Sequence, residues 1–173
     1  MPGFSIRPLE NSDISIVTEW ARYEGFAPGN QDVSIYKHTD SQGIWVGCLN
    51  SKPIGCIAGI RYNDLYGFIG LFLVVKEFRG NGYGISLWKQ ALHHLDSLPC
   101  IGLEAAPDRI KNYSDWGFLP SSKTTRWQLP SHKRITNKHF YDSISKNPRG
   151  LRLVEGSEIP DDSVHQYDAK REP

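Results

Sequence analysis

A glycine-rich turn separates an apolar run from a strongly amphipathic segment. The turn reads Arg79-Gly80-Asn81-Gly82-Tyr83-Gly84, residues 68–75 before it are apolar at nearly every position, and apolar residues recur at helical spacing over 85–95. This order predicts a strand, a tight connection and a helix N-terminus whose backbone N–H groups point outward. Glycines at the turn keep side chains away from an anion and allow positive φ values. We expect either an anion-binding loop or a strand-to-helix connection without a ligand.

Three strand-like runs lead up to the turn, at residues 44–49, 54–62 and 68–75. Short polar turns separate them, which favours an antiparallel meander. The third run is apolar at nearly every position and is predicted to be the central strand, buried on both faces. The second run is rich in glycine and alternates only in part.

Shorter elements are predicted on either side of this core. They are a strand over 4–7, a helix from Asn11 or Ser12 to 23–25, a loop over 26–30, a strand over 100–104, a helix over 108–116 closed by Gly117, and a strand over 124–129. Residues 131–173 are polar and punctuated by proline, so we assign little structure to them. We expect one domain over 1–130 and a polar C-terminal tail over 131–173.

Composition and charge narrow the class of partner. Twenty Lys and Arg against nineteen Asp and Glu leave a formal net charge of +1, so no broad field favours nucleic acid or an anionic membrane. No apolar stretch is long enough to span a bilayer and the N-terminus lacks a secretion signal, so we expect a cytoplasmic protein. The widely spaced Cys48, Cys56 and Cys100 indicate buried free thiols and no metal site.

The glycine turn departs from two common phosphate motifs. It lacks the Gly-Lys-Ser/Thr ending of a Walker-type loop, and its glycine spacing does not fit the dinucleotide fingerprint. Instead, residues 79–84 resemble the Gln/Arg-x-x-Gly-x-Gly/Ala motif of the GNAT N-acetyltransferase superfamily. A second stretch, Tyr113-Ser114-Asp115-Trp116-Gly117-Phe118, resembles the Tyr-x-x-x-Gly-Phe signature of the same family. The order of strands and helices from Phe4 to Leu129 also fits.

The resemblance implies an α+β fold with a mixed, mostly antiparallel sheet, helices on both faces and splayed central strands. It implies an enzyme that moves the acetyl group of acetyl-CoA, its co-substrate, directly to a primary amine, without a metal. An amide-rich pantetheine arm would bond the splayed strand like an added strand. The residues that the resemblance assigns to the cofactor are Phe72, Leu73, Val74, Arg79, Gly80, Asn81, Gly82, Tyr83, Gly84 and Ile85.

By the same resemblance Tyr113 protonates the departing thiolate, and the backbone N–H of Val74 is a candidate oxyanion donor. Many family members carry a carboxylate base on the strand before the loop, but residues 68–75 contain none. Glu104, at the end of the next strand, is the best remaining carboxylate, and it can instead bind a cationic substrate or pair with an arginine. His38 is a more distant candidate base.

The acceptor stays open between small-molecule and peptide amines. Five aromatic residues are candidates for a wall of its site or for core positions: Trp20, Tyr23, Phe26, Tyr62 and Tyr66. The missing carboxylate motivates an alternative function, a non-catalytic module that binds acyl-CoA. Residues 164–171 weakly resemble the start of a second domain, so the tail can be a truncated domain. We also keep a homodimer open.

Overall fold

The structure is a computed structural model that describes residues 3–125, 127 and 156–169. The chain divides into two compact units, Met1–Leu119 and Pro120–Pro173. Each unit is described by itself below.

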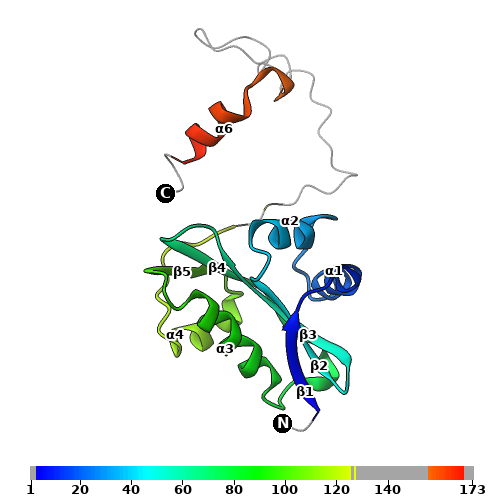
Figure 1. Ribbon diagram of the computed structural model, residues 1–173. Coiled ribbons are helices and arrows are strands. Elements are labelled where there is room, and N and C mark those ends of the chain that lie inside the picture. Colours follow the sequence, from blue (N-terminus) through cyan, green and yellow to red (C-terminus); the bar gives the residue numbers. More distant parts are fainter. Residues whose placement is uncertain (1–2, 126, 128–155, 170–173) are drawn as a thin grey trace. The chain divides into compact units, whose positions relative to one another are not determined.

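A five-stranded sheet forms the centre of the first unit (Figure 1). Its strands are β1 (Phe4–Pro8), β2 (Ile44–Leu49), β3 (Lys52–Arg61), β4 (Tyr66–Val74) and β5 (Cys100–Leu103), and they lie side by side in that order. Neighbouring strands from β1 to β4 are antiparallel, whereas β5 is parallel to β4. The mixed, mostly antiparallel sheet is therefore confirmed, and so is the meander.

The middle strand is β3, so the prediction that residues 68–75 form the central strand is wrong. Seven consecutive β3 residues, 54–60, are buried, while β4 alternates between buried and half-buried positions. Glycine allows the double burial of β3 because it lets neighbours approach closely. A Cβ added to Gly59 would lie 3.1 Å from the Cβ of Ala91 on the facing helix, and one added to Gly55 would lie 2.7 Å from the carbonyl oxygen of Leu73.

Gly55→Ala tests this close approach. The new methyl group would meet a backbone oxygen of β4, which can yield only if the strand shifts. We expect a loss of about 1–3 kcal/mol in the free energy of unfolding, as for other overpacked sites. Urea unfolding followed by circular dichroism measures the loss. Gly156→Ala is the control, because a Cβ there meets nothing within 4 Å; equal stability of the two variants would refute the packing argument.

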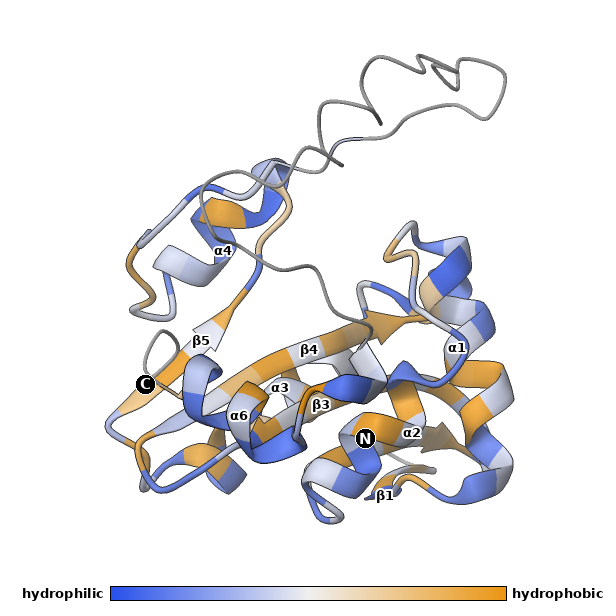
Figure 2. Cartoon of the chain, turned by 90° about the horizontal axis from the view of Figure 1, so that it is seen from above, coloured by the Kyte–Doolittle hydropathy of each residue, from blue (hydrophilic) through white to orange (hydrophobic). Residues whose placement is uncertain are grey.

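Helices cover both faces of the sheet, as predicted. They are α1 (Ile14–Tyr23), α2 (Asp32–Thr39), α3 (Tyr83–Leu95) and α4 (Ile110–Ser114). Figure 1 shows α1 and α2 on one side and α3 on the other, and two separate hydrophobic clusters fill the two layers. Figure 2 shows hydrophobic colour along much of β3 and β4 and a mixture of both colours along α1.

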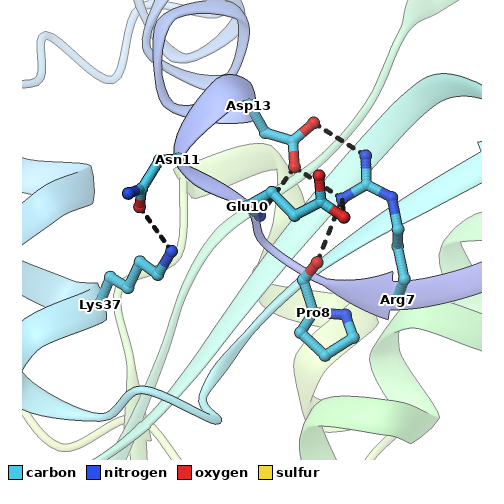
Figure 3. Close-up of polar contacts among 6 residues, drawn as sticks. All are labelled: Arg7, Pro8, Glu10, Asn11, Asp13 and Lys37. Atoms are coloured by element: carbon cyan, nitrogen blue, oxygen red, sulfur yellow. Dashed lines mark hydrogen bonds and ion pairs between the residues drawn. The ribbon is translucent and has the colours of Figure 1, made fainter.

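The N-terminal strand is tied to the start of the first helical segment by a partly buried ion pair (Figure 3). Arg7 donates two hydrogen bonds to Asp13, at 2.6 and 2.9 Å, and Asp13 also accepts from the backbone N–H of Glu10 at 2.8 Å. The helical segment therefore begins with a short turn, η1 (Asn11–Asp13), capped at Glu10 rather than at Asn11 or Ser12. The prediction of a helix ending near residues 23–25 is confirmed.

Several predictions for shorter segments were wrong. Helix α2 was not predicted, and it contains His38, whose ring nitrogen lies 2.7 Å from the carbonyl oxygen of Ser34. Cys48 and Cys56 are buried, but Cys100 is exposed on the edge strand β5. Residues 124, 125 and 127 are not in a strand, and the remainder of the predicted strand lies outside the described residues.

The second unit contains a short helix where little structure was expected. Its described elements are η5 (Gly156–Glu158) and α6 (Asp161–Asp168). Pro160 and two acidic residues in the first turn suit a helix start. In the described parts of the chain no helix is long and apolar enough to cross a membrane.

Candidate active site

Strands β4 and β5 are paired at one end and part at the other. β5 pairs with β4 only over residues 66–69, whereas β4 continues to Val74. Strand β4 contains a bulge. Cys56 and Ala58 of β3 have one residue between them, whereas their partners Leu73 and Gly70 on β4 have two. Leu71 in the bulge has a φ of 46°, rare for a leucine, and its carbonyl accepts a bond from the buried Cys56 thiol at 3.2 Å. The predicted splay is confirmed.

The splay exposes backbone groups of Val74. The N–H of Val75 donates to Ile54 on β3 at 2.8 Å. Because successive backbone groups of a strand face opposite sides, the N–H and carbonyl of Val74 face away from β3. They therefore face the side on which β5 has diverged, where a ligand amide or an oxyanion would meet them.

The glycine turn leads directly into α3. Gly80 and Gly82 have φ values of 79° and 82°, in the left-handed region that favours glycine, and Gly82 is the N-cap without a side-chain capping bond. Asn81 folds back to donate to the carbonyls of Phe78 and Arg79, at 3.2 and 3.1 Å. The turn thus holds its shape through its own side chains and leaves the first amides of a 13-residue helix as anion donors.

Arg79 is engaged by two partners in the protein itself. Its Nε donates to the carbonyl oxygen of Val74 at 2.6 Å, and one Nη lies 2.5 Å from a carboxylate oxygen of Glu24, at the end of α1. Its guanidinium is therefore fixed beside the splayed end of β4, where it retains further N–H donors for a ligand.

A cavity of about 530 Å³ lies against the splayed end of β4. Six of the residues assigned to the cofactor line it: Phe72, Leu73, Val74, Arg79, Gly84 and Ile85. The other four, Gly80, Asn81, Gly82 and Tyr83, do not line it, and the ring of Tyr83 instead packs on Phe4 with the centroids 4.7 Å apart. Glu24 and Phe26, at the start of the loop after α1, also border the cavity.

Tyr113 and Glu104, the two residues expected to act in catalysis, both line this cavity. Tyr113 lies on α4 and is half-buried, and burial raises the pKa of its hydroxyl although the nearby Arg109 acts in the opposite direction. Within the described part of the chain its hydroxyl makes no hydrogen bond, unlike a tyrosine tied to the helix end. Gly117 closes α4 with a φ of 92°, as expected for a helix end.

Glu104 follows β5 at the point where the strand diverges from β4, and it is exposed. It lies in no ion pair among the described residues, so the alternative that it pairs with an arginine is not observed. A carboxylate there is accessible to a substrate amine.

Aromatic rings gather beneath the cavity. The ring of Trp88 lies 5.5 Å from those of Phe72 and Tyr113 and 5.9 Å from those of Trp116 and Phe118, centroid to centroid. Trp88 is 3% exposed, and its indole N–H is buried without a hydrogen-bond partner among the described residues. A buried unpaired donor beside a cavity suits a ligand carbonyl.

A second, smaller cavity of about 110 Å³ lies at the same end of β4. Trp20 and Tyr23 of the predicted aromatic wall line it, and Phe26 lines the larger cavity. Tyr62 and Tyr66 stack on each other, 6.1 Å between centroids, and line neither cavity. The five aromatics therefore do not form one wall. His38 lines neither cavity.

Glu24, Trp88, Arg109 and Trp116 line the site although sequence reasoning did not single them out for it. Trp88 was predicted as a core position of the helix, and it is indeed buried there as well as lining the cavity. Glu24 gave no signal, because its partner Arg79 lies 55 residues away. No group of three or more His, Cys, Asp or Glu side chains suited to a metal occurs in the described ranges.

Comparisons with known proteins bear on the family and on the fold. The model of the acetyltransferase (GNAT) family matches residues 13–118, more than half of the chain. Over 120 residues the chain is 32% identical to the holothin acyltransferase of Pseudoalteromonas sp. (strain SANK 73390). That match covers 69% of this chain and only 40% of the relative, so the chain spans less than half of the relative's length.

Solved structures with the same fold include Ard1 from Thermoplasma volcanium, with 22% identity, a TM-score of 0.62 and coverage of 69% of this chain and 85% of that one. A structure from Clostridium acetobutylicum, described as a predicted acetyltransferase with acetyl-CoA, has 18% identity, a TM-score of 0.55 and coverage of 73% of this chain and 96% of that one. These likenesses concern the fold. Together with the family match over the cavity-lining segments, they lead to one conclusion: the chain belongs to the acetyltransferase (GNAT) family.

Proposed function

We propose that the chain is an N-acetyltransferase that moves the acetyl group of acetyl-CoA to a primary amine. The observation that carries the proposal is the single cavity in which the splayed end of β4, Arg79 and Tyr113 meet. The pyrophosphate binds the first amides of α3 and the Arg79 guanidinium. The pantetheine amides bond the open edge of β4, and the indole N–H of Trp88 supplies a further donor.

The reaction is a direct transfer. A neutral amine attacks the thioester carbonyl, and the N–H of Val74 donates to the oxyanion that forms. The tetrahedral intermediate collapses, the C–S bond breaks, and the Tyr113 hydroxyl gives its proton to the departing thiolate. Glu104 accepts a proton from the amine nitrogen. A tyrosine hydroxyl with an ordinary pKa near 10 already carries its proton at neutral pH, and burial raises the pKa of Tyr113 further.

Titration with acetyl-CoA and assay of thiol release test the proposal in two steps. We expect calorimetry to show one binding site, and CoA thiol to appear only when an amine from a panel of small-molecule and peptide amines is present. Alanine at Arg79 should weaken binding by roughly 10- to 150-fold, because a charge-assisted contact contributes about 1.5–3 kcal/mol. Absence of binding at high micromolar acetyl-CoA would refute the proposal.

A non-catalytic module that binds acyl-CoA is the second candidate. It is favoured by the absence of a carboxylate from β4 and by the exposure of Glu104. It predicts tight cofactor binding without thiol release for any amine. Turnover that depends on Tyr113 would eliminate it.

A further inference from the structure

Glu24 stands where the two cavities meet. It lines both of them, together with the β4 residues Leu73 and Val74, and among the described residues it is the one charged side chain common to both. Its carboxylate is 28% exposed and pairs with Arg79, which is 42% exposed. The ion pair therefore links the glycine turn on one side to the end of α1 on the other.

This contact conflicts with a bound pyrophosphate. The guanidinium of Arg79 donates through Nε to the carbonyl oxygen of Val74 and through one Nη to Glu24, so its other N–H groups are left for a ligand. A pyrophosphate bound to them would place a second anion on the same guanidinium as the Glu24 carboxylate, and the two anions repel each other. The arriving cofactor therefore weakens the pairing of Glu24 with Arg79.

The smaller cavity has the chemistry to use the released carboxylate. Its volume of about 110 Å³ suits the end of an alkyl chain, and its lining includes the aromatic rings of Trp20 and Tyr23. Glu77 adds a second carboxylate and Lys76 a single cation. Aromatic faces and carboxylates are the groups that hold an organic ammonium ion.

We propose that Glu24 exchanges partners: the cofactor pyrophosphate takes Arg79 from it, and the released carboxylate then binds the ammonium group of the acceptor at the mouth of the smaller cavity. This inference rests on the proposed function. It makes the binding ordered, because the Glu24 carboxylate that binds the acceptor is engaged by Arg79 until the cofactor binds. The acceptor class is a primary alkylammonium.

The test compares Glu24→Gln with Glu19→Gln, a control that removes an exposed carboxylate of α1 outside both cavities. Calorimetry with CoA should show about two- to fivefold tighter binding for Glu24→Gln, the size expected for a partly exposed ion pair, and no change for Glu19→Gln. In an Arg79→Ala background the gain should disappear. Equal or weaker CoA binding by Glu24→Gln, or a gain that persists without Arg79, would overturn the exchange.

Butylammonium probes the second half of the exchange. We expect it to bind the wild-type complex with CoA, to bind the free protein at least tenfold more weakly, and to lose affinity for the Glu24→Gln complex. Equal binding with and without CoA would overturn the coupling, and so would no binding to the wild-type complex. If CoA itself does not bind the wild type, the proposed function has failed, whereas normal CoA binding without these differences refutes only the exchange.

Discussion

Tyr113→Phe is expected to lower kcat by about 100-fold or more, the usual contribution of a positioned general acid. The substitution removes only the hydroxyl of a cavity-lining residue, and this hydroxyl has no hydrogen-bond partner among the described residues. The phenyl ring keeps its packing on Trp88 and Phe118. Acetyl-CoA affinity should therefore stay within about twofold, and the loss should appear in kcat rather than in binding.

The matched control is Tyr62→Phe, at an exposed tyrosine that lines neither cavity, and there we expect no change in kcat. Steady-state thiol release gives kcat, and calorimetry gives the affinity for acetyl-CoA. The pH profile supplies a further readout: since burial raises the pKa of Tyr113 above 10.0, its alkaline limb should lie above about pH 10. Unchanged kcat in the phenylalanine variant would assign the proton to another donor.

The elements with strong periodic patterns were predictable from sequence. The three strand-like runs and the helix after the glycine turn match β2, β3, β4 and α3, because apolar runs bounded by turn residues mark the strands and helical spacing marks the helix. Helix α2 was missed because it buries only Val33 and leaves Ile35 53% exposed, so it has almost no apolar stripe. Burial of β3 on both faces was missed because glycine carries no hydrophobic signal.

The parts of the site that depend on local backbone were predictable only through family resemblance. The φ of 46° at Leu71 cannot be read from a run of apolar residues. It lies in the bulge of β4, beyond which the backbone N–H and carbonyl of Val74 face away from β3. Contacts between residues that are distant in the sequence are equally hard to predict. Asp40 and His94, for example, are 54 residues apart in the chain, yet their side chains approach to 2.7 Å. Residue spacing predicts contacts within one helix or strand. Contacts such as that between Asp40 and His94 depend on how separate elements pack, so spacing does not predict them.

Removing the carboxylate of Asp13 is expected to cost about 2–4 kcal/mol in the free energy of unfolding. Asp13 is 4% exposed, and it holds both Arg7 of β1 and the N–H of Glu10 (Figure 3). In Asp13→Ala the N–H of Glu10 loses its acceptor, and the part-buried guanidinium of Arg7 loses both bonds to Asp13 and keeps the one to the carbonyl of Pro8. Urea unfolding measures the difference, and Asp64→Ala, at an exposed turn, should change stability by no more than about 0.5 kcal/mol.

The pH dependence of stability separates the charge of Asp13 from its shape. The hydrogen bonds from Arg7 lower its pKa below the ordinary 3.8, against the effect of burial, and Arg7 holds its own proton more tightly in return. A carboxyl with a depressed folded-state pKa stabilises the fold above its unfolded pKa, and this stabilisation is lost as the pH falls through the folded value. Asp40, whose pKa is lowered by its bonds from His94 and two backbone N–H groups although burial opposes them, acts with the same sign.

Wild-type stability should therefore decline from about pH 4 downward, and the decline should be shallower in Asp13→Asn, which keeps the shape of the side chain but cannot titrate. The asparagine variant and the wild type should then differ most at neutral pH and converge in acid. Parallel curves for the two proteins between pH 2 and pH 7 would show that Asp13 acts through hydrogen-bond geometry alone, and that the charge of the Arg7 pair adds nothing to the hold of β1 on α1.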